Sequence, residues 1–298
     1  MSRLSKKQPG HSGDEDGASR RFFVQPQAVD RGADEPVTTA ASPKSPQIEW
    51  RIGRSVQLLE EDAHHALHVI RLQIGDALLG LDGAGCEIPL RVTATGRSSV
   101  TAEVFGSVRF EEPPGSKASR LPHLRLAVSL PRPTRVEAMI DRLTQMGVAH
   151  ITPIWSGRSP EYARSLGQAK RSRLTRTARE ACKQCTRLWL PTIDDAQKLD
   201  TLNALDGPTG YLLDPGADQD LLQAMSANPS SAYQLVIGPE GGWTDAEQAL
   251  LATRGFQRVR LAGHVMRIET AAELASGLVM QVPRTAQAAE AGSQSATR

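Results

Sequence analysis

Apolar and polar positions follow two different rhythms in the C-terminal half of the chain. Residues 124–130, 151–155 and 235–237 are short apolar runs, which are typical of buried strands. Residues 134–146 instead carry apolar side chains at every third or fourth position, which predicts a helix. Because such runs and helices alternate strictly, we expect an α/β domain whose parallel sheet is covered on both faces.

The same pattern predicts the remaining elements of this domain. Further strands are expected at 188–193, 211–215 and 259–261, and further helices in the basic stretch ending at Cys185, over 194–205 and 218–227, from Thr244 and from Glu269. The segment 235–273 thus contains two neighbouring strand–loop–helix units. Ligands of open α/β sheets bind outside the carboxyl ends of the strands, so we expect the active site here.

The front of the chain has a different pattern, with short apolar segments at close spacing and turn residues between them. Strands are expected at 20–24, 77–81, 88–94 and 100–105, and a short helix at 63–71. Many short strands at this spacing indicate a small β-barrel or sandwich.

Four stretches lack the apolar residues that a core requires. We expect disordered tails at 1–19 and 285–298, a mobile insertion at 26–46, and a linker at 113–121. These assignments leave one domain at 20–112 and a second domain at 122–284.

Composition restricts the class of protein and the compartment. Apolar residues make up 39% of the 298 residues and charged residues 23%, values ordinary for a globular protein. No apolar run approaches the length of a membrane span, and the polar residues 1–19 do not form a secretory signal. Three cysteines do not make a disulfide framework. We therefore expect a cytoplasmic protein without a membrane partner.

The net charge of +2 conceals a local excess of positive charge. The segment 164–187 contains eight Lys or Arg residues and a single acid, Glu180. Such a block can attract a polyanion, and it can equally be the solvated face of a helix. Charge alone leaves both interpretations open.

Two loops are candidates for ligand binding. The glycines of 238–242 (GPEGG) allow backbone groups to approach a ligand, but the segment is neither a P-loop nor a dinucleotide fingerprint, and a tight turn would use the same residues. Thr244 and Glu247 form a capping-box pattern. Arg267, Glu269 and Thr270 could orient a polar ligand, although acids in a first helical turn also suit helix capping.

Metal and redox sites are not favoured by the remaining motifs. His64 and His68 are spaced for one helix face, but no third Cys or His ligand lies nearby, so structural or RNA-facing roles are preferred over zinc. Cys182 and Cys185 have redox spacing but lie in a basic helix rather than after a strand. We expect no metal, and any chemistry must depend on a bound cosubstrate.

Several short motifs occur in an order that resembles the ribosomal RNA small subunit methyltransferase E family. They are RFFV at 21–24, HALHVIR at 65–71, Met146 to Val148, Glu180-Ala181 with Gln184 and Arg187, GPEGG at 238–242 and LAGHVMRIETA at 261–271. The resemblance covers roughly residues 20–283. Each motif is weak alone, but their shared order is specific.

The resemblance implies a fold, a reaction and partners. The fold would be a PUA-like β-barrel followed by an α/β SPOUT domain with a deep trefoil knot, a rare exception to unknotted topology. A homodimer would bind S-adenosylmethionine in the knot and methylate N3 of one uridine in 16S ribosomal RNA of the small subunit.

The resemblance also assigns residues. For the cosubstrate they are Leu213, Gly238, Pro239, Glu240, Gly241, Gly242, Leu261, Val265 and Met266. For catalysis they are Arg267, Glu269 and Thr270. For RNA binding they are Arg20, Arg21, His65, Arg71, Arg158, Arg179 and Arg187.

Two departures from the family pattern bear on the expected reaction. Ala262 replaces a glycine and His264 replaces an arginine, so the loop could lack a positive-φ position and a permanent charge. We expect direct transfer of the methyl group, with Arg267 stabilising a uracil anion; the residues identify no general base. The alternatives are a SPOUT ribose 2′-O-methyltransferase acting on tRNA or rRNA, and a non-catalytic RNA-binding assembly factor.

Overall fold

The computed structural model describes residues 20–26, 50–204 and 207–282. The expected tails lie outside these residues, as does nearly all of the expected 26–46 insertion. The chain divides into two compact units, Met1–Leu81 with Ile88–Ser107, and Asp82–Glu87 with Val108–Arg298. Among the described residues, no helix combines the length and the apolar character needed to span a bilayer.

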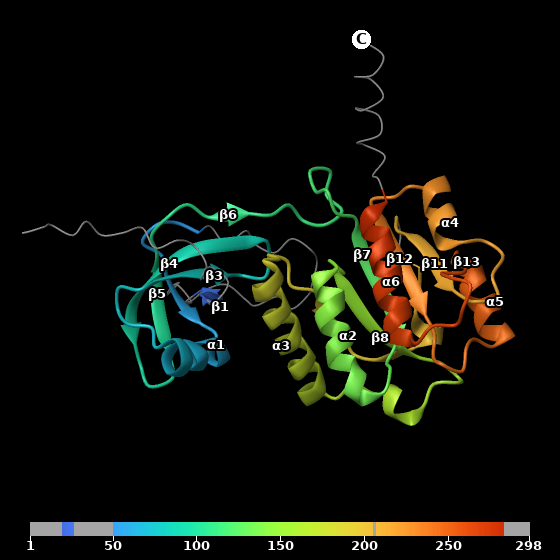
Figure 1. Ribbon diagram of the computed structural model, residues 1–298, viewed down its shortest axis with the longest axis horizontal. Coiled ribbons are helices and arrows are strands. Elements are labelled where there is room, and N and C mark those ends of the chain that lie inside the picture. The colour runs from blue at the N-terminus through green and yellow to red at the C-terminus, as the bar shows by residue number, and fades with distance from the viewer. Residues whose placement is uncertain (1–19, 27–49, 205–206, 283–298) are drawn as a thin grey trace, which may run out of the picture. The chain divides into compact units, whose positions relative to one another are not determined.

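The first unit contains a closed β-barrel (Figure 1). Its strands are β1 (Arg21–Pro26), β2 (Ser55–Leu58), β3 (Ala77–Leu81), β4 (Cys86–Thr95) and β5 (Val100–Val104). They pair in the order β3-β1-β2-β5-β4, and an additional β3–β4 pairing closes the ring. The short β6 (Arg109–Phe110) belongs to the second unit and pairs antiparallel with Cys86 and Glu87 at the start of β4. Val56, Leu81 and Ile88 are fully buried. The predicted small barrel is confirmed.

The helix expected at 63–71 differs in kind from the one observed. A short α-helix, α1 (Glu60–His65), continues directly into a π-helix, η1 (Ala66–Ile70). The Leu72 N–H donates to the Ala66 carbonyl at 2.9 Å, and Arg71 adopts a left-handed conformation with φ of 59°. Apolar spacing cannot distinguish one wide helical turn from an α-helical one, and π-turns are frequent at functional sites.

The second unit is built on a parallel sheet. Its strands are β7 (His123–Ser129), β8 (His150–Trp155), β9 (Thr192–Ile193), β10 (Gln197–Lys198), β11 (Thr209–Leu213), β12 (Ala232–Ile237) and β13 (Gln257–Val259). They run in the order β10-β8-β7-β12-β11-β13, with β9 on β8, and every pair is parallel. The predicted α/β domain behind a β-barrel is confirmed; the trefoil knot stays a prediction.

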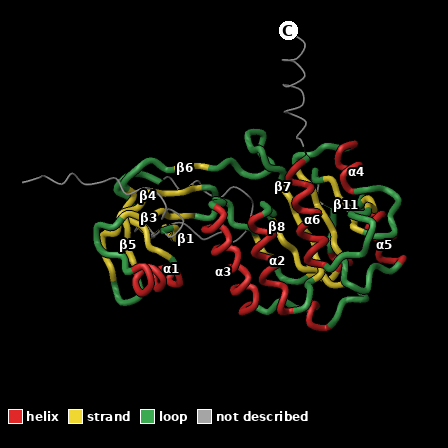
Figure 2. Tube along the Cα trace, in the orientation of Figure 1, coloured by secondary structure: helices red, strands yellow, loops and turns green. Residues whose placement is uncertain are grey.

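Helices cover both faces of this sheet. They are α2 (Pro133–Gln145), α3 (Gln168–Cys185), α4 (Leu221–Ala227), α5 (Asp245–Thr253) and α6 (Ile268–Gln281), with 3₁₀ turns η2 (Glu161–Ala163) and η3 (Leu199–Thr201). In Figures 1 and 2, α2 and α6 lie in front of the strands.

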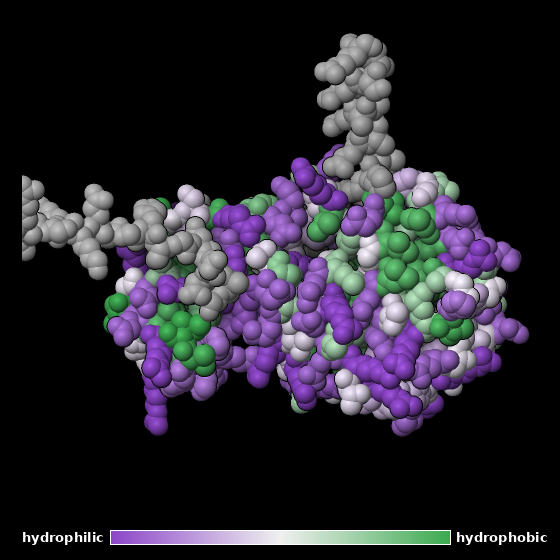
Figure 3. Space-filling model, in the orientation of Figure 1, coloured by the Kyte–Doolittle hydropathy of each residue, from purple (hydrophilic) through white to green (hydrophobic). Residues whose placement is uncertain are grey.

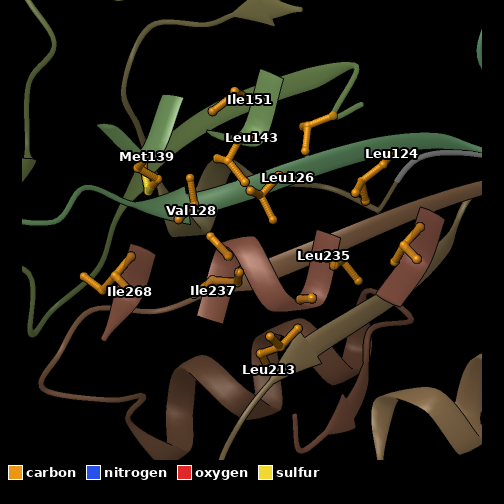
Figure 4. Packing of buried hydrophobic residues seen from close by; sticks show 14 of the residues in the cluster. Leu124, Leu126, Val128, Met139, Leu143, Ile151, Leu213, Leu235, Ile237 and Ile268 are labelled. Carbon is orange, nitrogen blue, oxygen red and sulfur yellow. The ribbon is translucent and has the colours of Figure 1, made fainter. Parts of the chain in front are cut away.

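The alternation of side chains along β7 explains how one sheet carries two cores. Leu126 and Val128 join the cluster that includes the α2 and α6 side chains, whereas Ala127 joins a second cluster that includes Leu251 of α5. Successive residues of a strand point to opposite faces, so one apolar run serves both clusters. Figure 4 shows Leu126 and Val128 near Met139 of α2.

The structure corrects the expected elements between 188 and 205. The strand expected at 188–193 is reduced to the two residues of β9. Trp189 is not part of it, because its indole N–H donates to the Glu111 carbonyl at 2.9 Å. The helix expected over 194–205 is wrong. The Asp194 carboxylate instead accepts hydrogen bonds from His150 (2.5 Å) and Thr152 (2.7 Å) of β8, and the chain continues into β10 and η3.

Candidate active site

A cavity lies at the carboxyl ends of the central strands. The loops after β11, β12 and β13 form it together with the first turn of α6. We call it the first cavity. Its lining includes most of the residues assigned to the cosubstrate by resemblance, namely Leu213, Gly238, Pro239, Glu240, Gly242, Leu261, Val265 and Met266. Gly241 is the exception, and it lines a neighbouring cavity instead.

The GPEGG loop has its shape because Trp243 packs against it. A Cβ added at Gly238 would lie 2.6 Å from the Trp243 ring, closer than real Cβ contacts allow. The buried indole N–H donates to the Leu213 carbonyl at 2.9 Å and thereby joins the loops after β11 and β12. Gly242 has φ of 71°, a left-handed conformation that favours glycine, and its N–H donates to the Pro239 carbonyl.

Two ion pairs lie in and beside the loops of the first cavity, and neither was predicted from the sequence. The Asp214 carboxylate accepts from Arg258 at 2.7 Å and from Gln248 at 3.0 Å, and its second oxygen accepts from the Gly216 N–H at 3.0 Å. Just after the end of β13, the Arg260 guanidinium lies 2.6 Å from the Asp220 carboxylate. The alternating arginines Arg258 and Arg260, in β13 and directly after it, were the available signal, but their acidic partners lie about 40 residues away in sequence.

The predicted capping box of α5 is confirmed, and it also reaches a second loop. The Thr244 hydroxyl accepts from the Glu247 N–H at 3.2 Å, and the Glu247 carboxylate accepts from the Thr244 N–H at 2.9 Å. The other Glu247 oxygen accepts from the Gly157 N–H, after β8, at 2.8 Å. Burial raises the pKa of Glu247, but these hydrogen bonds outweigh burial and bring the pKa below its ordinary value.

A second cavity, of about 450 Å³, lies beside the first. The loops after β7, β8 and β12 form it, and it shares Glu240 and Ile268 with the first cavity. Arg158 lines it, but the guanidinium donates to the carbonyls of Gly241 and Trp243, each at 3.0 Å. This residue, expected at RNA, therefore braces the GPEGG loop.

The three predicted catalytic residues lie at the start of α6 and differ in their exposure. Arg267 is the N-cap of α6 and is exposed, as is Thr270. Glu269 is buried and accepts from Arg135 of α2 at 3.2 Å, and its second oxygen is buried without a partner among the described residues. None of the three lines either cavity, although Ile268 lines both.

The residues expected at RNA divide between surface and structural positions. In the first unit Arg20, His65 and Arg71 are exposed, and Arg21 is half-buried. In the second unit, Arg179 is half-buried.

The remaining predicted RNA contact, Arg187, has a structural place. Its guanidinium donates to the carbonyls of Thr144, in the last turn of α2, and of Val148, after that helix, each at 2.8 Å. Because both backbone carbonyls engage the Arg187 guanidinium, a contact of this side chain with RNA is disfavoured.

Much of the positive charge on α3 is paired. Arg171 lies 2.8 Å from Asp195, and Arg173 lies 2.7 Å from Glu137. Exposed ion pairs of this kind contribute little to the stability of the fold, but they reduce the positive charge available to a polyanion. The solvated-face interpretation of the basic block therefore gains support.

The cysteine and histidine motifs do not assemble a site. Burial raises the pKa of the Cys182 thiol to about 12, so the thiol stays protonated at neutral pH. The rings of His64 and His68 lie 4.5 Å apart. In the part of the chain that the structure describes, no three His, Cys, Asp or Glu side chains are grouped to hold a metal ion.

The departures in the loop after β13 are mild. Ala262 and His264 both line the first cavity. Ala262 is not among the described residues with positive φ, which besides glycines are Arg71 and Thr186. The replacement of a glycine therefore introduces no backbone strain at this position.

Comparison with known proteins identifies the second unit. Residues 118–280 match the RNA methyltransferase domain family. The ribosomal RNA small subunit methyltransferase E of a Synechocystis strain is 30% identical over 233 residues, covering 76% of this chain and 73% of that protein. Its Bacillus subtilis counterpart is 26% identical over 222 residues, covering 71% and 84%.

A solved structure shows the same fold. The ribosomal RNA small subunit methyltransferase E from Neisseria gonorrhoeae, bound to S-adenosyl methionine, superimposes with a TM-score of 0.65 at 23% identity. The superposition covers 86% of this chain and 94% of that one. The likeness therefore extends through both the barrel and the parallel sheet.

Proposed function

Because the chain belongs to the ribosomal RNA small subunit methyltransferase E family of RNA methyltransferases, we propose that it methylates N3 of one uridine in 16S ribosomal RNA with S-adenosylmethionine. The observation that carries the proposal is the first cavity. Eight positions assigned to the cosubstrate from sequence line this one space, at the strand ends where α/β sheets bind ligands.

The residues of the first cavity fit such a cosubstrate. Gly238 and Gly242 line the cavity without side chains, and Leu213, Leu261 and Met266 supply apolar walls. Apolar walls with a few fixed polar groups are typical of small-molecule sites. The relative from Neisseria gonorrhoeae, with the same fold, was solved bound to S-adenosyl methionine.

The chain's own task in this reaction is to position the acceptor. When bound, S-adenosylmethionine supplies an electrophilic methyl group, so alignment of the uracil nitrogen matters most. N3 must give its proton to the surrounding water, which leaves negative charge on the ring, and the methyl group would bond to N3 as its bond to sulfur breaks and S-adenosylhomocysteine leaves. Arg267 is exposed and precedes Ile268, one of the two residues shared by the cavities, and we assign it to stabilise this charge.

Methyl transfer to purified small ribosomal subunits tests this role. Arg267→Ala should lower turnover by roughly 10²- to 10³-fold, as removal of one charge-stabilising donor does in other enzymes. Calorimetry should find S-adenosylmethionine binding unchanged. Arg120→Ala, another exposed arginine, is the matched control. Full activity of Arg267→Ala would refute the role, and methyl groups on ribose oxygens would favour a 2′-O-methyltransferase.

A homodimer is also part of the proposal. Leu274 of α6, Val265 before it and Leu222 of the neighbouring α4 are exposed to 41%, 79% and 51%. Figure 3 shows hydrophobic residues gathered over α6. Apolar patches of this kind mark interaction sites. Leu274→Glu should shift the sedimentation of the protein from dimer to monomer, and unchanged sedimentation would remove α6 from the interface.

RNA binding is proposed for the basic side chains of the first unit. Arg20 and Arg71 are exposed and able to meet phosphates. Affinity for the RNA should therefore fall steeply as salt rises. A flat salt dependence would contradict this part of the proposal.

A further inference from the structure

The second cavity has the size and place of a substrate site. Its volume of about 450 Å³ falls in the range of small-ligand pockets, roughly 300–1,000 Å³. It opens at the carboxyl ends of β7, β8 and β12 and shares Glu240 and Ile268 with the first cavity. A molecule bound here would therefore border directly on one bound in the first cavity.

The floor of this cavity is fixed before any ligand arrives. The loop after β8 is held by the Gly157–Glu247 and Arg158–Gly241 hydrogen bonds. Within the loop, the Ser156 N–H donates to the Ser159 hydroxyl at 2.9 Å. A preorganised site loses little entropy when it binds its ligand.

Two side chains at the cavity are available to a ligand. Tyr162, in η2, is 39% exposed, and Arg132, the N-cap of α2, is exposed. Across the described ranges, neither side chain makes a hydrogen bond or ion pair. Aromatic rings stack on unpaired nucleic-acid bases, and arginine binds phosphates, here with the positive end of the α2 dipole beside it.

We propose that the second cavity receives the target nucleotide of the RNA, with its base against the Tyr162 ring and its phosphate at Arg132. The assignment rests on the proposed function, because a methylated base must leave its stack to reach the methyl donor. It adds a base platform and a phosphate contact to the cosubstrate and catalytic residues assigned by resemblance.

Glu240 would determine how the target nucleotide is oriented in the second cavity. The residue is exposed and lines both cavities, so its negative charge would repel a phosphate there and favour the Arg132 side. A carboxylate accepts hydrogen bonds, and N3 of uracil carries a hydrogen whereas N3 of cytosine does not. The same carboxylate would therefore favour the binding of uracil over that of cytosine.

The test is a kinetic comparison of Tyr162→Ala, Tyr162→Phe and Arg132→Ala on small ribosomal subunits. Tyr162→Ala should raise the KM for the subunit by roughly 5- to 150-fold, the range found when stacking aromatics are removed. Tyr162→Phe retains the ring and should stay within about twofold of wild type. Arg132→Ala should also raise KM and reduce its salt dependence.

Two controls separate this role from a structural one. Phe110→Ala removes another exposed aromatic and should leave KM unchanged. Calorimetry should find the same S-adenosylmethionine affinity in all variants. Wild-type KM in Tyr162→Ala, or an equal rise in Phe110→Ala, would overturn the pocket assignment alone. A wild-type protein that transfers no methyl group would instead overturn the proposed function beneath it.

Discussion

Replacement of Gly238 by alanine is the sharpest test of how the first cavity is built. The new Cβ would lie 2.6 Å from the Trp243 ring, which is only 7% exposed and hydrogen-bonded to Leu213, so the ring must move. Overpacking typically costs about 1–3 kcal/mol, and a weakened hydrogen bond about 0.5–1.5 kcal/mol. We expect a loss of about 2–4 kcal/mol in the free energy of unfolding, and weaker S-adenosylmethionine binding.

Urea unfolding and calorimetry measure the two effects. Gly263→Ala is the matched control, because Gly263 is a glycine of the neighbouring loop with nothing within 4 Å of its added Cβ. Trp243→Leu should remove the clash, so Gly238→Ala should cost much less in that background, and the double-mutant cycle isolates the coupling. If Gly238→Ala matches Gly263→Ala in stability and affinity, or if the cycle shows no coupling, the reasoning is refuted.

Three further predictions follow from individual contacts. Arg187→Leu should lower the free energy of unfolding, measured in urea, by about 3 kcal/mol or more, because two charge-assisted hydrogen bonds are lost. It should leave the salt dependence of RNA binding unchanged, and a changed salt slope would restore the RNA role of Arg187. Arg71→Gly should preserve stability, because glycine adopts φ of 59° freely, yet weaken RNA binding in filter assays; unaltered binding would contradict the assignment. Glu247 has a lowered pKa, so its stabilisation is present above its ordinary value of 4.5 and is lost as pH falls through the lowered value; urea midpoints of Glu247→Gln should therefore fall less steeply below pH 4.5 than those of wild type.

The architecture could be predicted because the spacing of apolar residues and the order of the elements can both be read along the sequence. The runs at 124–130 and 235–237 became neighbouring parallel strands, and the capping box of Thr244 formed as its spacing predicts. The helix expected at 194–205 failed because a tertiary contact, between Asp194 and His150, overrides weak helical propensity.

Only those parts of the site that form local sequence motifs could be predicted. The GPEGG loop is recognisable from its glycines, and the residues around it line the first cavity. Glu269 was expected to face the reacting centre or the core of the knot, and its ion pair with Arg135, 134 residues away in sequence, could not be read from the chain. Tyr162 carried no motif at all, and only the three-dimensional arrangement places it at a cavity.

The central claim, methylation of uridine N3 in 16S ribosomal RNA, is tested most directly by nucleoside mass spectrometry. Ribosomal RNA from cells lacking this protein would be compared with RNA from cells in which the wild-type chain or Arg267→Ala is restored. We predict that N3-methyluridine is absent from 16S ribosomal RNA without the protein, returns with the wild type and does not return with Arg267→Ala. Unchanged N3-methyluridine in the cells lacking the protein would contradict the claim.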